Sequence, residues 1–357
     1  MLESSPKLKA KAVQIIETGD GVILKRGCTE FKVAGEGAAE ALKRILAVAG
    51  NGGATSEEIR ELFEPETVPV IEQLSEQLLD RRLLAPCEGE VSLESPESHF
   101  DIFYWHFGEK TARVTERLNR RTLVILGVNC ISRQLVASLA ASEVESFQVL
   151  DHPRLRNLRL FDEAGKLKAD QWPASLKAPQ DWTDSLGPQS FDCLIATSDF
   201  GGQEAMLEWN ALCVKENRHF LPVVLQDLIG YVGPLVIPGE TACLECLRTR
   251  QNSQTKDYQS RRLTEDAAFE GQGAIGFHPS MASIIGNIAA FELIKFYSDV
   301  LPFSKVGTLI EVNLLATAMK SRKVLKIPRC PTCSPLKTRP STTPYKPNFK
   351  LPTADDK

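Results

Sequence analysis

The chain has 357 residues, of which 43% are hydrophobic and 25% are charged, and its formal net charge at pH 7 is −4. This composition indicates a folded protein with room for two domains, and the slightly acidic balance argues against nucleic acid or an anionic membrane as a partner. No apolar run approaches the ~20 residues of a membrane helix, and the N-terminal segment lacks the apolar core of a secretion signal. With nine cysteines and no such signal, the sequence predicts a cytoplasmic protein whose thiols are reduced or bind metal.

Residues 1–92 show the pattern of short strands followed by three helices, which is typical of a winged-helix domain. Ser56 is the expected N-cap of the second helix, and Val70 is expected on the buried face of the third. The expected strands are 12–16, 21–25, 29–33 and 88–91, and the expected helices are 36–48, a short one from 56, and 68–79.

Charge decides between the two usual ligands of a winged helix. Residues 1–90 contain 11 Lys and Arg against 16 Asp and Glu, and the third helix offers acids and glutamines where a DNA-reading helix would offer Arg or Lys. We therefore expect an extended peptide to add to the edge strand 29–33 and to fill the groove beside the helix at 68–81. The candidate peptide contacts are Phe31, Val33, Gln73, Glu76, Gln77 and Asp80.

The remainder of the chain divides into three parts. Residues 93–118, rich in aromatic side chains, are expected to be a less regular linker packed on the following domain. Residues 119–333 alternate strands and helices, which predicts a doubly wound, Rossmann-like α/β sheet with ligands at the carboxyl ends of its strands. Its long apolar helix, 279–297, is expected in the core or in a dimer interface. Residues 334–357 are expected to form a flexible, Pro-rich tail. The expected strands are 122–126, 146–150, 193–196, 220–225 and 233–237, and the other expected helices are 132–142 and 204–216.

Two C-x-x-C pairs lie about 80 residues apart, Cys243 with Cys246 and Cys330 with Cys333. Four thiolates complete the tetrahedral coordination of zinc and leave no open position, so they indicate a structural rather than a catalytic metal. Coincidence or a redox C-x-x-C motif is the alternative. Two such pairs in one chain favour zinc.

The run 233–247, GPLVIPGETACLECL, resembles the ThiF/MoeB adenylating superfamily. Further likenesses follow in the order of that family: a glycine loop at Gly127, a strand ending at Asp151, an Asn-Leu segment at 157–158, and Asp199. The resemblance implies that Gly127 and Asp151 belong to a nucleotide site, with Asp151 toward the ribose and Asp199 toward metal or phosphate.

The glycine loop departs from that family. A G-x-G-G-x-G loop lets the backbone approach phosphates, whereas this chain has Gly127-Val-Asn129-Cys130-Ile-Ser132 and keeps only the first glycine. No cysteine for a thioester lies within 247–329. The three nucleotide-site residues are therefore expected to be relics, ATP-Mg is not expected as a cofactor, and no catalytic residue is assigned.

A peptide-recognition domain joined to such a ThiF-like domain resembles the cyclodehydratase partner proteins of azoline-forming peptide biosynthesis. The resemblance implies that the chain binds the leader of a ribosomally made precursor and presents it to a YcaO-type, ATP-dependent cyclodehydratase, with a homodimer expected. One alternative is a stand-alone enzyme that adenylates a peptide carboxylate, for which Asp151 and Asp199 remain in place. A DNA-binding regulator is the third possibility, and the charge of residues 1–90 disfavours it.

Overall fold

The computed structural model describes residues 6–50, 52–87, 97–182 and 191–335. It divides into two units, Met1–Val114 and Thr115–Lys357. Each unit has a hydrophobic core of its own. None of the helices within the described ranges is both long enough and apolar enough to cross a bilayer.

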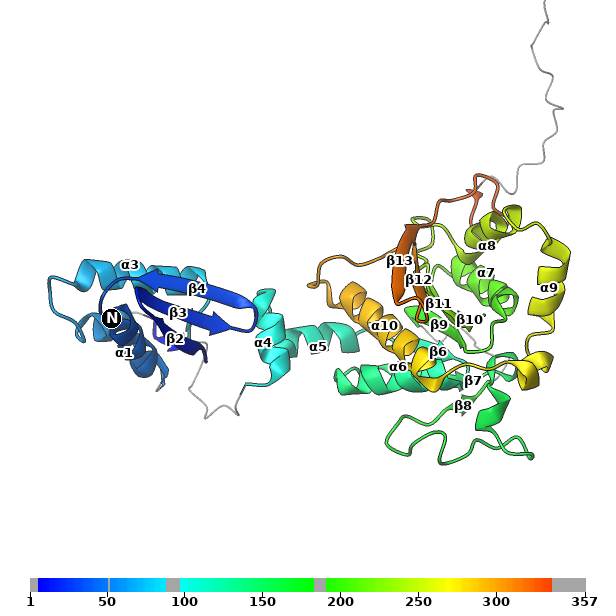
Figure 1. Cartoon of the computed structure of the whole chain (residues 1–357), viewed down its shortest axis with the longest axis horizontal. Helices are drawn as coiled ribbons and strands as arrows, with labels where there is room; N and C mark the ends of the chain where they lie inside the picture. Colours follow the sequence, from blue (N-terminus) through cyan, green and yellow to red (C-terminus); the bar gives the residue numbers. More distant parts are fainter. Residues whose placement is uncertain (1–5, 51, 88–96, 183–190, 336–357) are drawn as a thin grey trace, which may run out of the picture. The chain divides into compact units, whose positions relative to one another are not determined.

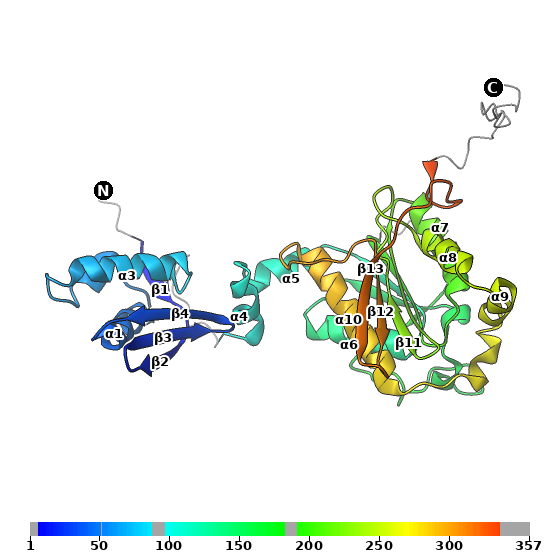
Figure 2. The ribbon, with the colours of Figure 1, turned by 45° about the horizontal axis from the view of Figure 1, so that its top comes forward.

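The N-terminal unit combines a three-stranded antiparallel sheet, in the order β2-β3-β4, with three helices and a two-stranded pair, β1-β5. In both Figure 1 and Figure 2, α3 runs alongside β4. The strands are β1 (Leu8–Ala10), β2 (Gln14–Thr18), β3 (Gly21–Arg26), β4 (Thr29–Ala34) and β5 (Leu84–Pro86), and the helices are α1 (Ala38–Gly50), α2 (Ser56–Arg60) and α3 (Val68–Asp80). The strand expected at 88–91 falls outside the described residues.

Alternation along β3 and periodicity along the helices build this core, as the sequence pattern predicts. Val22 and Leu24 point inward from β3 and meet Leu42 and Ile45 of α1. The cap of α2 differs by one residue from the expectation, because Thr55 rather than Ser56 precedes the helix. Thr55 forms a capping box with Glu58, each side chain bonding the other's backbone amide.

The segment expected to be an irregular linker is helical instead. It contains α4 (His99–His106), which belongs to the N-terminal unit rather than packing on the following domain, and α5 (Thr111–Asn119). The guanidinium of Arg26, only 3% exposed, binds the Glu97 carboxylate at 2.8 Å and lies 4.7 Å from the centre of the Trp105 ring. Because a buried charge needs such partners, these contacts fix α4 against the end of β3.

The C-terminal unit contains an eight-stranded mixed sheet in the order β13-β12-β11-β10-β9-β6-β7-β8. The strands from β8 to β10 in this order are parallel, whereas β11, β12 and β13 extend the sheet antiparallel. β11 (Ile229–Val232), which pairs with β10, lies just before the strand that was expected at 233–237. The strands are β6 (Leu123–Leu126), β7 (Phe147–Asp151), β8 (Gln180–Asp181), β9 (Cys193–Ser198), β10 (His219–Gln226), β11 (Ile229–Val232), β12 (Thr308–Asn313) and β13 (Ala318–Lys323).

Helices cover both faces of this sheet. Figure 1 shows α6 and α10 side by side on one face and α7 and α8 on the other. The α-helices are α6 (Cys130–Ala141), α7 (Leu207–Lys215), α8 (Leu244–Ser253), α9 (Tyr258–Asp266) and α10 (Pro279–Ser298); the short 3-10 helices are η1 (Pro153–Leu155), η2 (Leu158–Leu160), η3 (Gln203–Met206) and η4 (Glu270–Ala274). This arrangement leaves the loops after β6, β7 and β9 at one edge of the sheet, where open α/β folds bind ligands.

Candidate functional site

The four predicted metal ligands lie together. Cys243 is the N-cap of α8, Cys246 is in its first turn, and Cys330 and Cys333 come from the segment after β13. Their sulfur atoms all lie within 4.8 Å of one another, and the Sγ–Sγ distances are 3.9 Å for 243–246, 3.6 Å for 243–330 and 3.5 Å for 246–333. Zinc–sulfur bonds of about 2.3 Å in a tetrahedron place sulfurs about 3.8 Å apart. The four thiols could therefore hold a metal ion, and the geometry fits zinc.

The surroundings favour a thiolate at Cys246, whereas the hydrogen bond to Cys246 raises the pKa of Cys243 and burial raises the pKa of Cys333. The backbone N–H of Ile327 donates to the Cys246 sulfur at 3.4 Å. A hydrogen bond from the Cys243 thiol lowers the pKa of Cys246 below its ordinary value. Cys243, Cys246 and Cys330 are buried. Four sulfur ligands without an open position would fasten the segment after β13 to α8, which is a structural role.

The loop after β6 is closed by the side chains of the protein. Asn129, fully buried, caps α6: its Oδ1 accepts from the N–H groups of Ile131 and Ser132 at 3.1 and 3.0 Å. The hydroxyl of Ser132 accepts from the Asn129 N–H at 2.9 Å. The N–H of Cys130 donates to an Asp199 carboxylate oxygen at 2.8 Å. The first amides of this helix, which in a phosphate-binding loop point at the ligand, therefore already have partners.

Asp199, directly after β9, links the loop after β6 to the segment after β7 through its hydrogen bonds. It is 1% exposed, and its carboxylate accepts both from Cys130 N–H and from the Asn157 side-chain amide, at 2.9 and 3.0 Å. Burial raises the pKa of Asp199 above its ordinary value, and these hydrogen bonds oppose the rise. The structure thus brings Asn157 and Asp199 into contact, as two of the residues that the family resemblance singled out. Both side chains are buried.

Asp151, at the end of β7, is also paired internally. Its carboxylate accepts from Arg156 Nε at 2.7 Å, and burial raises its pKa. The next residue, His152, packs its ring edge-to-face against Trp182 and Trp209, at centroid distances of 5.0 and 4.7 Å. The side chains at the carboxyl end of β7 therefore contact one another.

The surviving glycine has a packing role. Gly127 has φ +104°, and a Cβ there would lie 2.7 Å from the Thr197 carbonyl oxygen and 2.9 Å from the Leu155 Cβ. A side chain does not fit at such distances. The neighbouring chain therefore accounts for Gly127 without a phosphate.

The N-terminal unit carries a groove of about 610 Å³ between the end of β4, α1 and α3. Its lining is largely apolar with an acidic rim, and the outer edge of β4 pairs with no other strand in the described part of the chain. The lining residues are Val33, Ala34, Gly35, Glu36, Gly37, Ala38, Glu40, Ala41, Arg44, Phe63, Glu66, Thr67, Val70, Ile71, Gln73, Leu74 and Gln77.

The candidate peptide contacts divide around this groove. Val33, Gln73 and Gln77 line it, whereas Glu76 and Asp80 are exposed on α3 but do not. Phe31 is 6% exposed in the core, and the Arg81 guanidinium lies 4.4 Å from its ring centre. Arg81 therefore covers the β4 edge residue that was expected to meet a peptide.

Val70 was expected to face the core, but its side chain is 65% exposed and lines the groove. Val70 thus adds an exposed apolar side chain to the wall of the groove. The sequence pattern could not show it, because a 3.6-residue periodicity does not distinguish a buried face from a groove wall. Phe63, in the turn after α2, and Arg44, on α1, also line the groove and were not among the candidate contacts.

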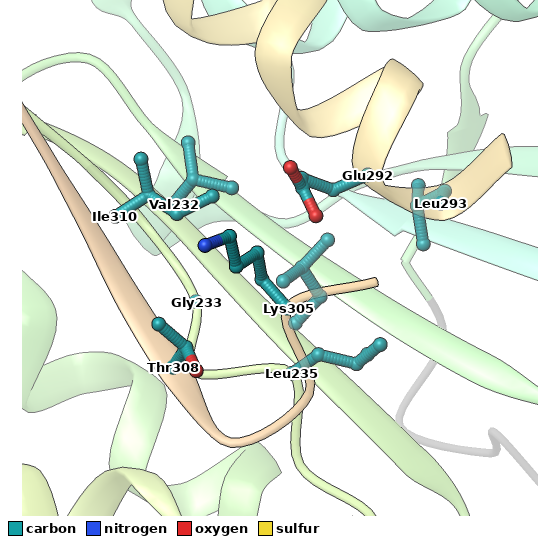
Figure 3. A pocket seen from close by; sticks show the side chains of 9 residues that line it. Val232, Gly233, Leu235, Glu292, Leu293, Lys305, Thr308 and Ile310 are labelled. Carbon is teal, nitrogen blue, oxygen red and sulfur yellow. The ribbon is translucent and has the colours of Figure 1, made fainter. Parts of the chain in front are cut away.

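A second cavity, beneath α10, is far smaller than the groove. It encloses about 10 Å³, room for at most about one water, between α10 and strands β10 to β12. Figure 3 shows the Glu292 carboxylate and the Lys305 ammonium group directed toward it. Glu292 already forms an ion pair with Lys295. This cavity is too small for an organic ligand.

The mixed sheet, its carboxyl-end loops and the four-cysteine cluster define a protein of the ThiF-like fold that the sequence resemblance implied. No protein-family model and no curated protein matches the chain. The heterocyclase TruD aligns over 93% of this chain and 43% of its own, with a TM-score of 0.60 and 20% identity.

Two further solved structures share the fold. A heterocyclase in complex with substrate and cofactor aligns over 94% of this chain and 40% of its own, with a TM-score of 0.58 and 19% identity. MccB from E. coli, solved with ATP, aligns over 92% of this chain and 99% of its own, with a TM-score of 0.62 and 19% identity. The chain thus spans about two fifths of the heterocyclase chains and nearly all of MccB. These likenesses establish the fold.

Proposed function

We propose that this chain is a non-catalytic recognition subunit that binds the leader segment of a ribosomally made peptide. The observation that carries the proposal is the groove beside the open edge of β4. An extended peptide adding to β4 gains main-chain hydrogen bonds, and alternate side chains enter the groove lined by Val33, Phe63 and Val70. We also propose that this unit is a winged helix, because its short strands and three helices follow the order of that class.

The closed loop after β6 supports a role without nucleotide chemistry. A phosphate at the start of α6 would have to displace the Asp199 carboxylate and the Asn129 side chain from the helix amides. It would also meet the buried negative charge of Asp199. ATP-Mg is therefore not part of the proposed function, whereas zinc at the four cysteines is, as a structural ion.

The length of the heterocyclase chains supports a separate catalytic partner. The heterocyclases of the same fold are more than twice as long as the region that this chain matches, and one was solved with substrate and cofactor. We propose that a separate YcaO-type cyclodehydratase supplies the ATP-dependent chemistry on Cys, Ser or Thr of the core peptide, which this subunit presents. Azoline formation in natural-product biosynthesis, such as that of bacteriocins, is the corresponding pathway class.

A second candidate function has one observation in its favour. MccB, which was solved with ATP, matches this chain along almost its whole length, and both Asp151 and Asp199 stand at strand ends here. A stand-alone enzyme that adenylates a peptide carboxylate is the corresponding alternative. It requires the loop 127–132 to open and release its internal hydrogen bonds.

Calorimetric titration of the same purified protein separates the two functions. Leader peptides encoded beside this gene should bind in the micromolar range or tighter, and ATP-Mg should give no heat of binding. Val70→Asp should weaken leader binding at least tenfold, because it places a charge on the groove wall. Ile16→Asp, at a residue 43% exposed on β2, is the matched control and should leave binding intact. ATP binding with pyrophosphate release on adding peptide would instead establish the adenylating enzyme.

A further inference from the structure

The charged side chains that line the groove of the N-terminal unit are mostly acidic. They are Glu36, Glu40, Glu66 and a single base, Arg44. Arg44 pairs with Glu40 at 3.2 Å, so it compensates one of the three carboxylates. Glu36 and Glu66 are exposed, and neither forms an ion pair with any residue in the described part of the chain. Two carboxylates of the rim are thus left to attract a cationic group of a ligand.

The helices around the groove reinforce its negative charge. Helix α3, which forms one wall, carries three acidic residues and contains no Lys or Arg. The remaining bases of the other two helices, Lys43 of α1 and Arg60 of α2, form ion pairs with Glu17 and Glu72. The electrostatic potential over the groove is therefore negative, which favours the approach of a basic ligand over that of an acidic one.

Apolar side chains share the groove with these carboxylates. Val70 is 65% exposed, and Val33, Phe63 and Ile71 line the same groove. A lysine or arginine side chain suits such a site, because its aliphatic stem covers apolar surface while its charged end stays at the rim. On a strand added to β4, residues two positions apart point to the same face. An apolar and a basic side chain at that spacing can therefore enter the groove together.

We infer that the peptide recognised in this groove is basic, with a Lys or Arg two positions from a large apolar residue among the side chains that enter the groove. The inference rests on the proposed function, because it names the chemical class of the peptide bound at the same site. Glu36 and Glu66 receive the basic side chain, and the wall at Val70 receives the apolar one. An acidic peptide would instead meet uncompensated carboxylates, which selects against it.

Selection from a displayed library of short random peptides, with the full chain as bait, tests this class of ligand. Sequences retained by the unaltered chain should carry Lys or Arg two positions from a large apolar residue at least threefold more often than the unselected library. Glu36→Gln with Glu66→Gln should remove this preference, because it neutralises the rim. Glu163→Gln with Glu208→Gln is the matched control: it makes the same change of net charge at exposed residues of the C-terminal unit and should keep the preference.

A synthetic peptide of the most enriched sequence then gives affinities by fluorescence anisotropy. Replacing its basic residue with Gln should weaken binding about fivefold at low ionic strength and less in concentrated salt, since exposed ion pairs are modest in energy and are screened. Val70→Asn, which makes the wall polar without changing its charge, should weaken the binding of both peptides.

The outcomes separate this inference from the proposed function. A selection without enrichment of Lys or Arg, or with enrichment of Asp or Glu, overturns the inference. A basic preference that survives Glu36→Gln with Glu66→Gln also overturns it, because these carboxylates are then not its cause. If leader peptides still bind in either case and Val70→Asn weakens them, the recognition function stands with a different class of peptide. If neither selected peptides nor leader peptides bind, both proposals fail.

Discussion

Gly127 is required by the packing of the chain around it. We expect Gly127→Ala to destabilise the chain by roughly 3 kcal/mol or more, because the new Cβ collides with backbone in addition to the unfavourable φ. Gly165→Ala is the matched control, with φ +74° and nothing within 4 Å of the added Cβ, and should cost roughly 1 kcal/mol. Urea unfolding of both variants measures the difference, and equal losses would contradict the packing explanation.

Asp199 should make stability depend on pH. Burial raises the folded-state pKa above the ordinary 3.8, so the folded protein holds this proton more tightly than the unfolded chain does. The contribution to the unfolding free energy is therefore largest below about pH 3.8 and is lost as pH rises through the folded pKa. Because Asn does not titrate, the stability of the parent relative to Asp199→Asn should fall between pH 4 and pH 7. Urea titrations across this range test the sign, and a constant or rising difference would refute it.

At the scale of single elements, α10 is an apolar helix whose burial is incomplete. Met281, Ile285 and Leu293 are buried, but Ile284 and Phe291 are 39% and 48% exposed and lie on one face, seven residues apart. We expect this face to pair two copies of the chain. Phe291→Glu should shift a dimer toward monomer in analytical ultracentrifugation, whereas Leu263→Glu, at an exposed residue of α9, should not. A dimer that persists in Phe291→Glu would exclude this face.

Prediction from sequence succeeded where an element has one buried face and one solvent-exposed face. Strand β3 and helix α1 follow their apolar periodicity closely, and the central parallel strands β6 and β9 are buried along their whole length, as expected of a covered sheet. The helix α4 was missed because its eight residues are mostly aromatic and have no polar stripe. Its structure depends on Trp105 packing over a buried Arg26, a contact 79 residues away in the chain.

The candidate sites divide in the same way. The three-residue spacing within each C-x-x-C pair places its two sulfurs close together, so the sulfur cluster could be anticipated from the sequence. The closure of the loop at 127–132 could be anticipated only as a loss of glycines. That Asn129 and Asp199 themselves cap the helix is a long-range fact, since they are 70 residues apart. The groove depends on where α3 lies beside β4, which no local pattern specifies.

The whole molecule consists of two units with separate cores, so we expect two unfolding transitions. A metal at the four cysteines stabilises only the C-terminal unit. Removing it with a strong chelator should cost ~3 kcal/mol or more and lower that unit's Tm by roughly 6–12 °C. Differential scanning calorimetry should show the N-terminal transition unmoved. A shift of both transitions, or of neither, would contradict this assignment.

The internal partners of the loop after β6 also bear on how this chain can evolve. Restoring a glycine at Asn129 removes a helix cap, and leaves the carboxylate of Asp199 against the site that a phosphate needs. Neutralising Asp199 strands the amides of Cys130 and Asn157 that now donate to it. Each of these two substitutions is thus expected to destabilise the fold. One substitution therefore cannot open this loop to a phosphate without a loss of stability.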